Sequence, residues 1–170
     1  MDLCEESIVM RRIALIGTPN AGKTALFNKI TRSNQRVANY AGVTVESSEA
    51  DFSFPKTPKQ SEALIDLPGA YSLRPYSDDE VVLTELIKTQ KFDGMFIVID
   101  ATQLERGVRF VMEVLDATTA PAVIALNMMD LAQARGFEID LKKLSEQLGV
   151  PVVSTAAVKN TGLKELLGTL

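Results

Sequence analysis

Short apolar runs alternate with amphipathic segments along most of the chain. Six segments have the length and composition of β-strands: Arg12–Ile16, Glu46–Phe54, Ala63–Leu67, Asp93–Asp100, Ala122–Asn127 and Val150–Ser154. Apolar residues recur at helical spacing in four others: Lys23–Thr31, Arg106–Ala117, Asp140–Leu148 and Thr161–Leu170. A capping box of Ser77 and Glu80 predicts one more helix start. This alternation predicts an α/β fold, with an about six-stranded, mostly parallel sheet and helices on both faces.

Two segments between these elements predict a turn and a loop. The polar turn Phe54–Ser61 contains two prolines, so the strands on either side of it are expected to form a hairpin. The segment from about Ser33 to Val45 is polar, contains Gly42 and has no clear period before Val43. We therefore expect a mobile loop there, ordered by a ligand.

Length and composition limit the classes of function. The chain has 170 residues, which suits one domain covering residues 1–170. A net charge of −4 without a basic stretch argues against nucleic acid as a partner. Cys4 is the only cysteine and histidine is absent, which excludes an internal disulfide, Ser–His triads and histidine zinc sites. The apolar runs are shorter than the roughly 20 residues that cross a membrane, so the chain is expected to be soluble.

The strongest chemical motif is Gly17–Thr24, which matches the P-loop pattern G-x-x-x-x-G-K-[ST]. It follows a predicted strand and precedes a predicted helix, the context that the motif requires. Glycines allow backbone N–H groups to surround phosphate oxygens, while Lys23 adds positive charge and the Thr24 hydroxyl ligates Mg²⁺. The motif predicts binding of a nucleoside triphosphate with magnesium.

Two further segments fit the phosphate end of such a site. Asp66 ends a predicted strand about forty residues after the P-loop, where a carboxylate holds the Mg²⁺ shell, and the Gly69 N–H can contact the γ-phosphate. Thr44 lies in the expected mobile loop, where a threonine can reach Mg²⁺ when the γ-phosphate is present.

The residues Asn127–Asp130 predict that the base is guanine. The Asp130 carboxylate can accept both N–H groups of the guanine edge, and adenine has no matching pair. Asn127 would brace both the base and the loop, whereas Met128 stands where many GTPases have lysine. After the last strand, Ala156 and Ala157 stand where a Ser-Ala pair is usual, so a hydroxyl that could brace this second loop beside the base is absent. We therefore expect low affinity for the nucleotide and a mobile loop there, which we call the base loop.

Together these motifs resemble the amino-terminal G domain of the bacterial ferrous iron transport protein B family. The resemblance covers nearly the whole chain and depends on these segments: Ile13–Gly17, Pro19–Thr24, Asn34–Val37, Gly42–Glu46, Asp66–Leu73, Val98–Thr102, Leu104–Arg106, Ala125–Asp130 and Leu148–Val153. It implies a Ras-like P-loop GTPase that hydrolyses GTP to GDP and regulates ferrous iron uptake. It also implies a place at the cytoplasmic face of the inner membrane, attached to helical and membrane domains that this chain lacks. Two alternatives remain open: a soluble RNA- or ribosome-associated GTPase, and a nucleotide-binding switch with negligible hydrolysis. Whether the chain forms a homo-oligomer is also left open.

The resemblance and the motifs assign the site residues. The predicted contacts of GTP or GDP are Gly17, Asn20, Ala21, Gly22, Lys23, Thr24, Ala25, Gly42, Val43, Thr44, Asp66, Gly69, Asn127, Met128, Asp130, Ala156 and Ala157. The predicted catalytic residues are Lys23, Thr44, Gly69 and Asn20, and the predicted Mg²⁺ ligands are Thr24, Thr44 and Asp66. Ala70 replaces the water-orienting glutamine of Ras-type enzymes, so hydrolysis is expected to be slow and to use K⁺ held by Asn20. The alternative is that Asn20 only hydrogen-bonds the backbone of the loop.

Overall fold

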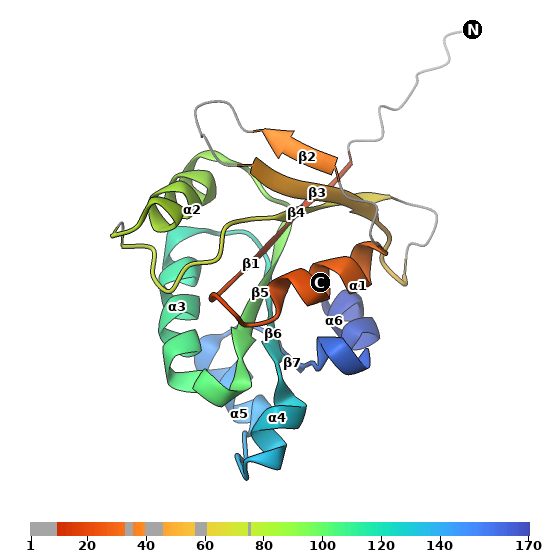
Figure 1. Ribbon diagram of the computed structural model, residues 1–170, viewed down its shortest axis with the longest axis vertical. Helices are drawn as coiled ribbons and strands as arrows, with labels where there is room; N and C mark the ends of the chain where they lie inside the picture. The colour runs from red at the N-terminus through yellow and green to blue at the C-terminus, as the bar shows by residue number, and fades with distance from the viewer. Residues whose placement is uncertain (1–9, 33–35, 40–45, 57–60, 75) are drawn as a thin grey trace, which may run out of the picture.

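The computed structural model of the chain describes residues 10–32, 36–39, 46–56, 61–74 and 76–170 (Figure 1). Within these residues, seven strands form one sheet in the order β2-β3-β4-β1-β5-β6-β7. The strands are β1 Arg12–Gly17, β2 Arg36–Asn39, β3 Glu46–Phe52, β4 Glu62–Asp66, β5 Gly94–Asp100, β6 Ala122–Asn127 and β7 Val152–Ser154. Strands β1, β4, β5, β6 and β7 are parallel, while β3 pairs antiparallel with both β2 and β4. The predicted α/β class and the predicted hairpin are confirmed.

The sheet has one strand more than the sequence pattern predicts. Strand β2 lies inside the segment expected to be a loop, and it pairs with β3 from Arg36↔Glu49 to Asn39↔Glu46. A four-residue strand is too short to show a period of two, and pairing with a neighbour specifies it better than its own composition does.

Helices cover both faces of the sheet, as predicted. Their bounds are α1 Lys23–Thr31, α2 Asp78–Thr89, α3 Leu104–Ala117, α4 Met129–Ala134, α5 Leu141–Leu148 and α6 Leu163–Thr169, with 3₁₀ turns η1 Ala101–Gln103 and η2 Ala157–Lys159. The capping box at the start of α2 is present, with both the Ser77 and the Glu80 side chains bonded as expected. Helix α4 was not expected from the sequence, because six residues contain too few turns to show a helical period.

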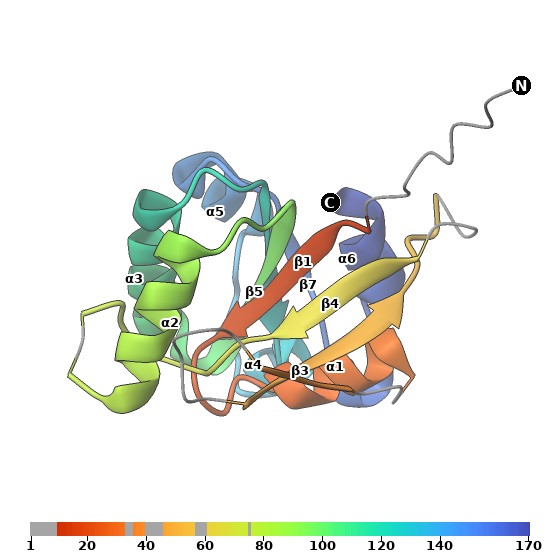
Figure 2. The same ribbon diagram turned by 90° about the horizontal axis from the view of Figure 1, so that it is seen from above.

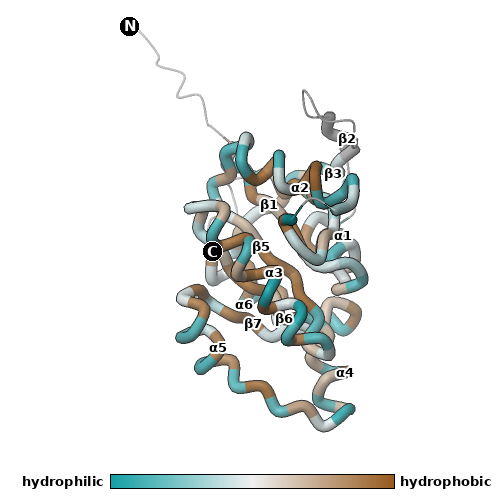
Figure 3. Tube along the Cα trace, turned by 90° about the vertical axis from the view of Figure 1, so that its left-hand side faces the viewer, coloured by the Kyte–Doolittle hydropathy of each residue, from teal (hydrophilic) through white to brown (hydrophobic). Residues whose placement is uncertain are grey.

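The sheet separates two hydrophobic cores. One core packs helices α2, α3 and α4 on one face, through buried side chains such as Leu83, Phe110 and Met129. The other packs α1 and α6 on the opposite face, through Phe27 and Leu166. Figure 2 shows this division, with α2 and α3 on one side of the strands and α1 and α6 on the other. Figure 3 shows the apolar course of the inner strands, and β5 is buried along its whole length.

Parallel strands bring the predicted motifs to one edge of the sheet. The carboxyl ends of β1, β4, β6 and β7 point the same way, and each is followed by one of the predicted motifs. Strand β1 lies between β4 and β5, at the point where the chain changes sides of the sheet, which is where α/β sheets bind ligands. Among the described residues, no helix has both the length and the apolar character to cross a membrane.

Candidate functional site

The loop between β1 and α1 is wrapped tightly against the sheet. Thr18 N donates to the Val98 carbonyl at 3.1 Å, and Ala21 N donates to the Thr18 carbonyl at 3.2 Å. Asn20 and Gly22 have left-handed backbones, with φ of 63° and 85°. These turns direct the chain into the start of α1, whose first N–H groups have no partner within the helix and so suit an anion.

Lys23 and Asp66 lie together at the opening of this loop. Lys23 is the first residue of α1 and Asp66 the last of β4, and the Lys23 ammonium donates to Asp66 Oδ1. Burial raises the pKa of the Asp66 carboxyl, while the charge and hydrogen bond of Lys23 lower it in part. A cation and a carboxylate thus meet where the motifs predict the outer phosphates and Mg²⁺. Thr24, exposed, and Ala25, partly buried, follow in the first turn of α1.

The turn after β4 lies directly against the P-loop. A Cβ added to Gly69 would lie 3.5 Å from the Gly17 carbonyl oxygen and 3.6 Å from Pro19 Cα, and Ala70 N donates to that same Gly17 carbonyl at 3.1 Å. Ala70 is only 2% exposed and packs in the core with α2 and α3. No polar side chain therefore projects from position 70 toward a phosphate.

Helix α3 holds the chain beyond Ala70, a feature that sequence reasoning missed. Glu113 Oε2 accepts hydrogen bonds from Ser72 Oγ at 2.7 Å and from Leu73 N at 2.6 Å. The Arg106 guanidinium carbon lies 3.3 Å from the centre of the Tyr71 ring. The signals in the sequence were the Asp66–Leu73 and Leu104–Arg106 segments of the resemblance, which did not reveal that the two segments lie together, and Glu113 belongs to neither.

Asn127 connects the predicted phosphate side of the site to the predicted base side. Its Nδ2 donates to the Ala21 carbonyl at 2.8 Å, while its Oδ1 accepts from Ala157 N at 3.0 Å and from Thr155 Oγ1 at 3.2 Å. The side chain is 3% exposed and approaches Gly22 so closely that a Cβ there would lie 2.3 Å from Asn127 Nδ2. These contacts brace the loops as the sequence predicts for Asn127, and its contact with the base stays a prediction.

The expectation of an unbraced base loop is wrong in one respect. The hydroxyl that is absent at Ala156 is replaced by Thr155 Oγ1, one residue earlier, which bonds to Asn127. Ala156 also forms an antiparallel bridge with Thr161, by hydrogen bonds of 3.1 and 3.2 Å. The sequence could not show this brace, because Asn127 and Thr155 meet only when β6 and β7 pair. Since the amides of Ala156 and Ala157 both donate within the protein, their contact with a base stays a prediction.

Met128 and Asp130 lie at the start of α4. Met128 precedes the helix with a left-handed φ of 61°, and Asp130 is in its first turn. Lys159 Nζ, from η2, lies 2.9 Å from Asp130 Oδ2. The hydrogen bond from Lys159 is the largest cause that holds the pKa of the Asp130 carboxyl below its usual value. Lys159 was not among the predicted site residues, although it follows the Ala156–Ala157 pair closely in the sequence.

The structure thus brings most of the predicted residues to one edge of the sheet. Gly42, Val43 and Thr44 lie outside the described residues, so their part in the site stays a prediction. The described residues contain no group of three or more Cys, Asp or Glu side chains placed to hold a metal ion.

Comparison with known proteins gives one consistent result. The family model described as ferrous iron transport protein B matches residues 11–170. The Fe(2+) transporter FeoB of Staphylococcus aureus N315 is 39% identical over 161 residues, which are 95% of this chain and 23% of the relative. The Fe(2+) transporter FeoB of Escherichia coli K12 is 40% identical over 158 residues, 91% of this chain and 20% of the relative.

Solved structures agree in fold and in sequence. A point mutant of S. thermophilus NFeoB bound to GDP has a TM-score of 0.84 and 43% identity, covering 94% of this chain and 61% of that chain. The cytosolic domain of L. pneumophila FeoB has a TM-score of 0.85 and 40% identity, covering 93% of this chain and 61% of that chain. The G domain of the T. maritima FeoB iron transporter has a TM-score of 0.80 and 38% identity, covering 92% of this chain and 94% of that chain.

Proposed function

Because the chain belongs to the ferrous iron transport protein B family, we propose that it is a guanine-nucleotide-binding domain that hydrolyses GTP to GDP. The observation that carries this proposal is the bonding of Asn127 to both the P-loop and the base loop, which holds the phosphate and base sides in one site. The GDP-bound S. thermophilus relative supports the choice of nucleotide.

The proposed wider role is regulation of ferrous iron uptake. The chain spans 23% of the length of the S. aureus relative, a transporter, so the transport function belongs to a longer protein of this family. We propose that residues 1–170 act as a single G domain at the cytoplasmic face of the bacterial inner membrane, joined to the transporter part of the same protein. The match to a separately solved T. maritima G domain supports a unit of this extent.

The phosphate end of the proposed site fits a magnesium ion. A threonine hydroxyl and a carboxylate are oxygen donors of the kind that Mg²⁺ prefers, and Asp66 lies beside Lys23 at the opening of the P-loop. Thr24, Asp66 and, from outside the described residues, Thr44 would hold the ion, which supplies positive charge to the phosphates. Lys23 would add its own charge and the Gly69 N–H would donate to the γ-phosphate. Binding Mg²⁺ would require Asp66 to exchange its contact with Lys23.

Turnover of GTP tests the catalytic part of the proposal. The purified chain should convert GTP to GDP in the presence of Mg²⁺, and Lys23→Ala should lose most of this activity because the phosphates lose a cation. ATP serves as the control substrate, since Asp130 cannot accept two N–H groups from adenine. Equal consumption of ATP and GTP, or full activity in Lys23→Ala, would contradict the proposed function.

Slow, potassium-dependent hydrolysis is the second catalytic proposal. Without a polar side chain at position 70, we expect turnover of about 10⁻⁴–10⁻² per second, as in small GTPases without an external arginine. A monovalent cation supplies charge that stabilises the transition state. Asn20 is exposed on the P-loop with a neutral side-chain carbonyl, a donor that fits such an ion.

The cation proposal is tested by measuring turnover in K⁺, Na⁺ and cation-free buffer. The parent chain should be fastest in K⁺, and Asn20→Ala should lose that advantage. If K⁺ gives the parent chain no acceleration over Na⁺, Asn20 has only a structural role in the loop.

A further inference from the structure

Two loops that are separate in sequence meet at the side chains of Lys159 and Asp130. Lys159 closes η2, which follows β7, and Asp130 is in the first turn of α4, which follows β6. Their 2.9 Å contact is a salt bridge at the rim of the site, since the Lys159 side chain is 63% exposed and the Asp130 side chain 27% exposed.

The remaining contacts of the loop explain why this pair matters. Thr155 and Ala157 are held by Asn127, and Ala156 by Thr161, so the first half of the loop is anchored through buried groups. Val158, by contrast, is 84% exposed at the tip of the loop. Lys159 is therefore the side chain that ties the outer half of the loop to α4.

Asp130 also has no cation on its own loop. Position 128 has a methionine, so the loop from Asn127 to Asp130 carries no positive charge. The pKa of Asp130 is lowered chiefly by Lys159, so the lysine favours the ionised carboxylate. A carboxylate has about four lone-pair positions, and the two N–H groups of a guanine edge use two of them. An ammonium can therefore remain on Oδ2 while a base is bound.

We propose that Lys159 is a specificity-determining positioning residue, which holds the Asp130 carboxylate in the orientation that accepts both N–H groups of guanine. This inference rests on the proposed function, because it assumes that Asp130 receives the base. Lys159 acts through Asp130 and does not itself need to touch the nucleotide.

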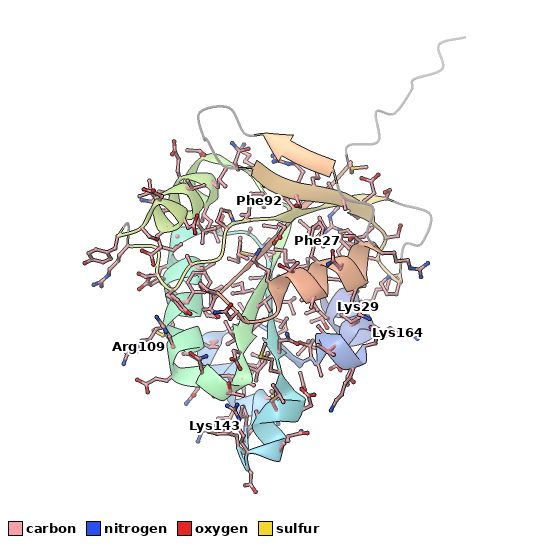
Figure 4. All side chains as sticks on the ribbon, in the orientation of Figure 1. Phe27, Lys29, Phe92, Arg109, Lys143 and Lys164 are labelled. Carbon is pink, nitrogen blue, oxygen red and sulfur yellow. The ribbon has the colours of Figure 1, made fainter. Side chains whose placement is uncertain are left out.

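Three variants test the role: Lys159→Met removes the charge but keeps a long side chain, Lys159→Arg keeps the charge, and Lys164→Met is the control. Lys164 is an exposed lysine on α6 (Figure 4). Affinities for GDP and for inosine diphosphate, which lacks the exocyclic amine, are measured for each. An exposed ion pair supports an effect of about two- to fivefold. Lys159→Met should weaken GDP by about this factor and affect inosine diphosphate less, so that the preference for GDP shrinks.

Rescue and salt dependence separate positioning from general damage to the loop. Lys159→Arg should keep the parent's preference for GDP over inosine diphosphate. The difference in GDP affinity between the parent and Lys159→Met should become smaller in high salt, which screens exposed charges. An unchanged preference in Lys159→Met, or an equal loss in Lys164→Met, would overturn the inference.

The variant Asp130→Asn distinguishes failure of the Lys159 inference from failure of the proposed function. If Asp130→Asn weakens GDP binding and Lys159→Met does not, the guanine site stands and only the role of Lys159 is wrong. If neither change affects GDP binding, Asp130 does not receive the base and both proposals fail.

Discussion

Asn127 and Gly22 show how single residues determine the geometry of the site. The Asn127 side chain bonds to Ala21, which is 106 residues away in sequence. This contact is possible because Gly22 has no Cβ, and because glycine adopts its φ of 85° without strain. The glycine of the motif therefore serves the base side of the site as well as the phosphate side.

At this scale we predict that Gly22→Ala destabilises the fold more than the same substitution at Gly136 does. Gly136 also has a positive φ, of 80°, but a Cβ there would meet nothing within 4 Å. Gly136→Ala should cost about 1–2 kcal/mol of unfolding free energy through backbone strain alone. Gly22→Ala should cost about 1–3 kcal/mol more, because Asn127 must also give up a buried hydrogen bond. Urea unfolding measures both, and equal costs would contradict the close contact.

Asp130 carries the residue-scale prediction on base choice. Asp130→Asn should weaken GDP binding by about tenfold or more, since a charged acceptor is lost. The same variant should bind xanthosine diphosphate better, because xanthine has a carbonyl where guanine has an amine. Titration with fluorescent GDP and xanthosine diphosphate analogues measures this change in base preference. Unchanged affinity for GDP would remove Asp130 from the site.

At the scale of elements, α3 connects the core to the segment that follows Gly69. Its buried face packs on the sheet through Phe110, Val111 and Val114, and it also carries Glu113 and Arg106, which hold Ser72, Leu73 and Tyr71. The turn that carries the Gly69 N–H is thus fixed on both sides, by the P-loop and by α3.

We predict that Glu113 contributes more to stability than another glutamate of the same helix. Glu113→Ala should lower the unfolding free energy by about 1.5–3 kcal/mol, because two donors lose a charged acceptor, and should speed hydrogen exchange at the Leu73 amide. Glu105 is 84% exposed and pairs with Arg109 one turn on, so Glu105→Ala should cost no more than about 0.5 kcal/mol. Similar costs for the two variants would contradict the role of Glu113.

At the scale of the whole molecule, the site joins both halves of the sheet. The P-loop follows β1, Asp66 ends β4, and the base loops follow β6 and β7, so one ligand would contact loops that lie far apart in sequence. A nucleotide that binds only the folded chain should therefore stabilise the molecule as a unit.

We predict a large thermal shift with GDP and Mg²⁺. At a concentration of 100 times Kd the ligand adds about 2.7 kcal/mol, which corresponds to about 5–10 °C in Tm for a chain of this size. Differential scanning calorimetry measures the shift, with ADP at the same concentration as the control. A shift of equal size with ADP would show that the base loops do not contribute to binding.

The sequence alone determined the α/β class, six of the strands, the start of α1 and the motifs of the site. These features depend on local chemistry: periods of two and 3.6, glycines that permit left-handed turns, and a capping box at α2. The carboxyl ends of parallel strands always meet at one edge of the sheet, so the sequence also indicates that Lys23, Asp66 and Asn127 lie close together.

Only the tertiary structure decided the contacts between segments distant in sequence. Strand β2 exists through pairing with β3, α4 is too short to show a period, and Thr155 braces Asn127 only because β7 lies beside β6. The pairing of Lys159 with Asp130 depends likewise on how two loops pack. Each residue of such a pair has many alternative partners in the sequence, and only the distances within the folded chain select one.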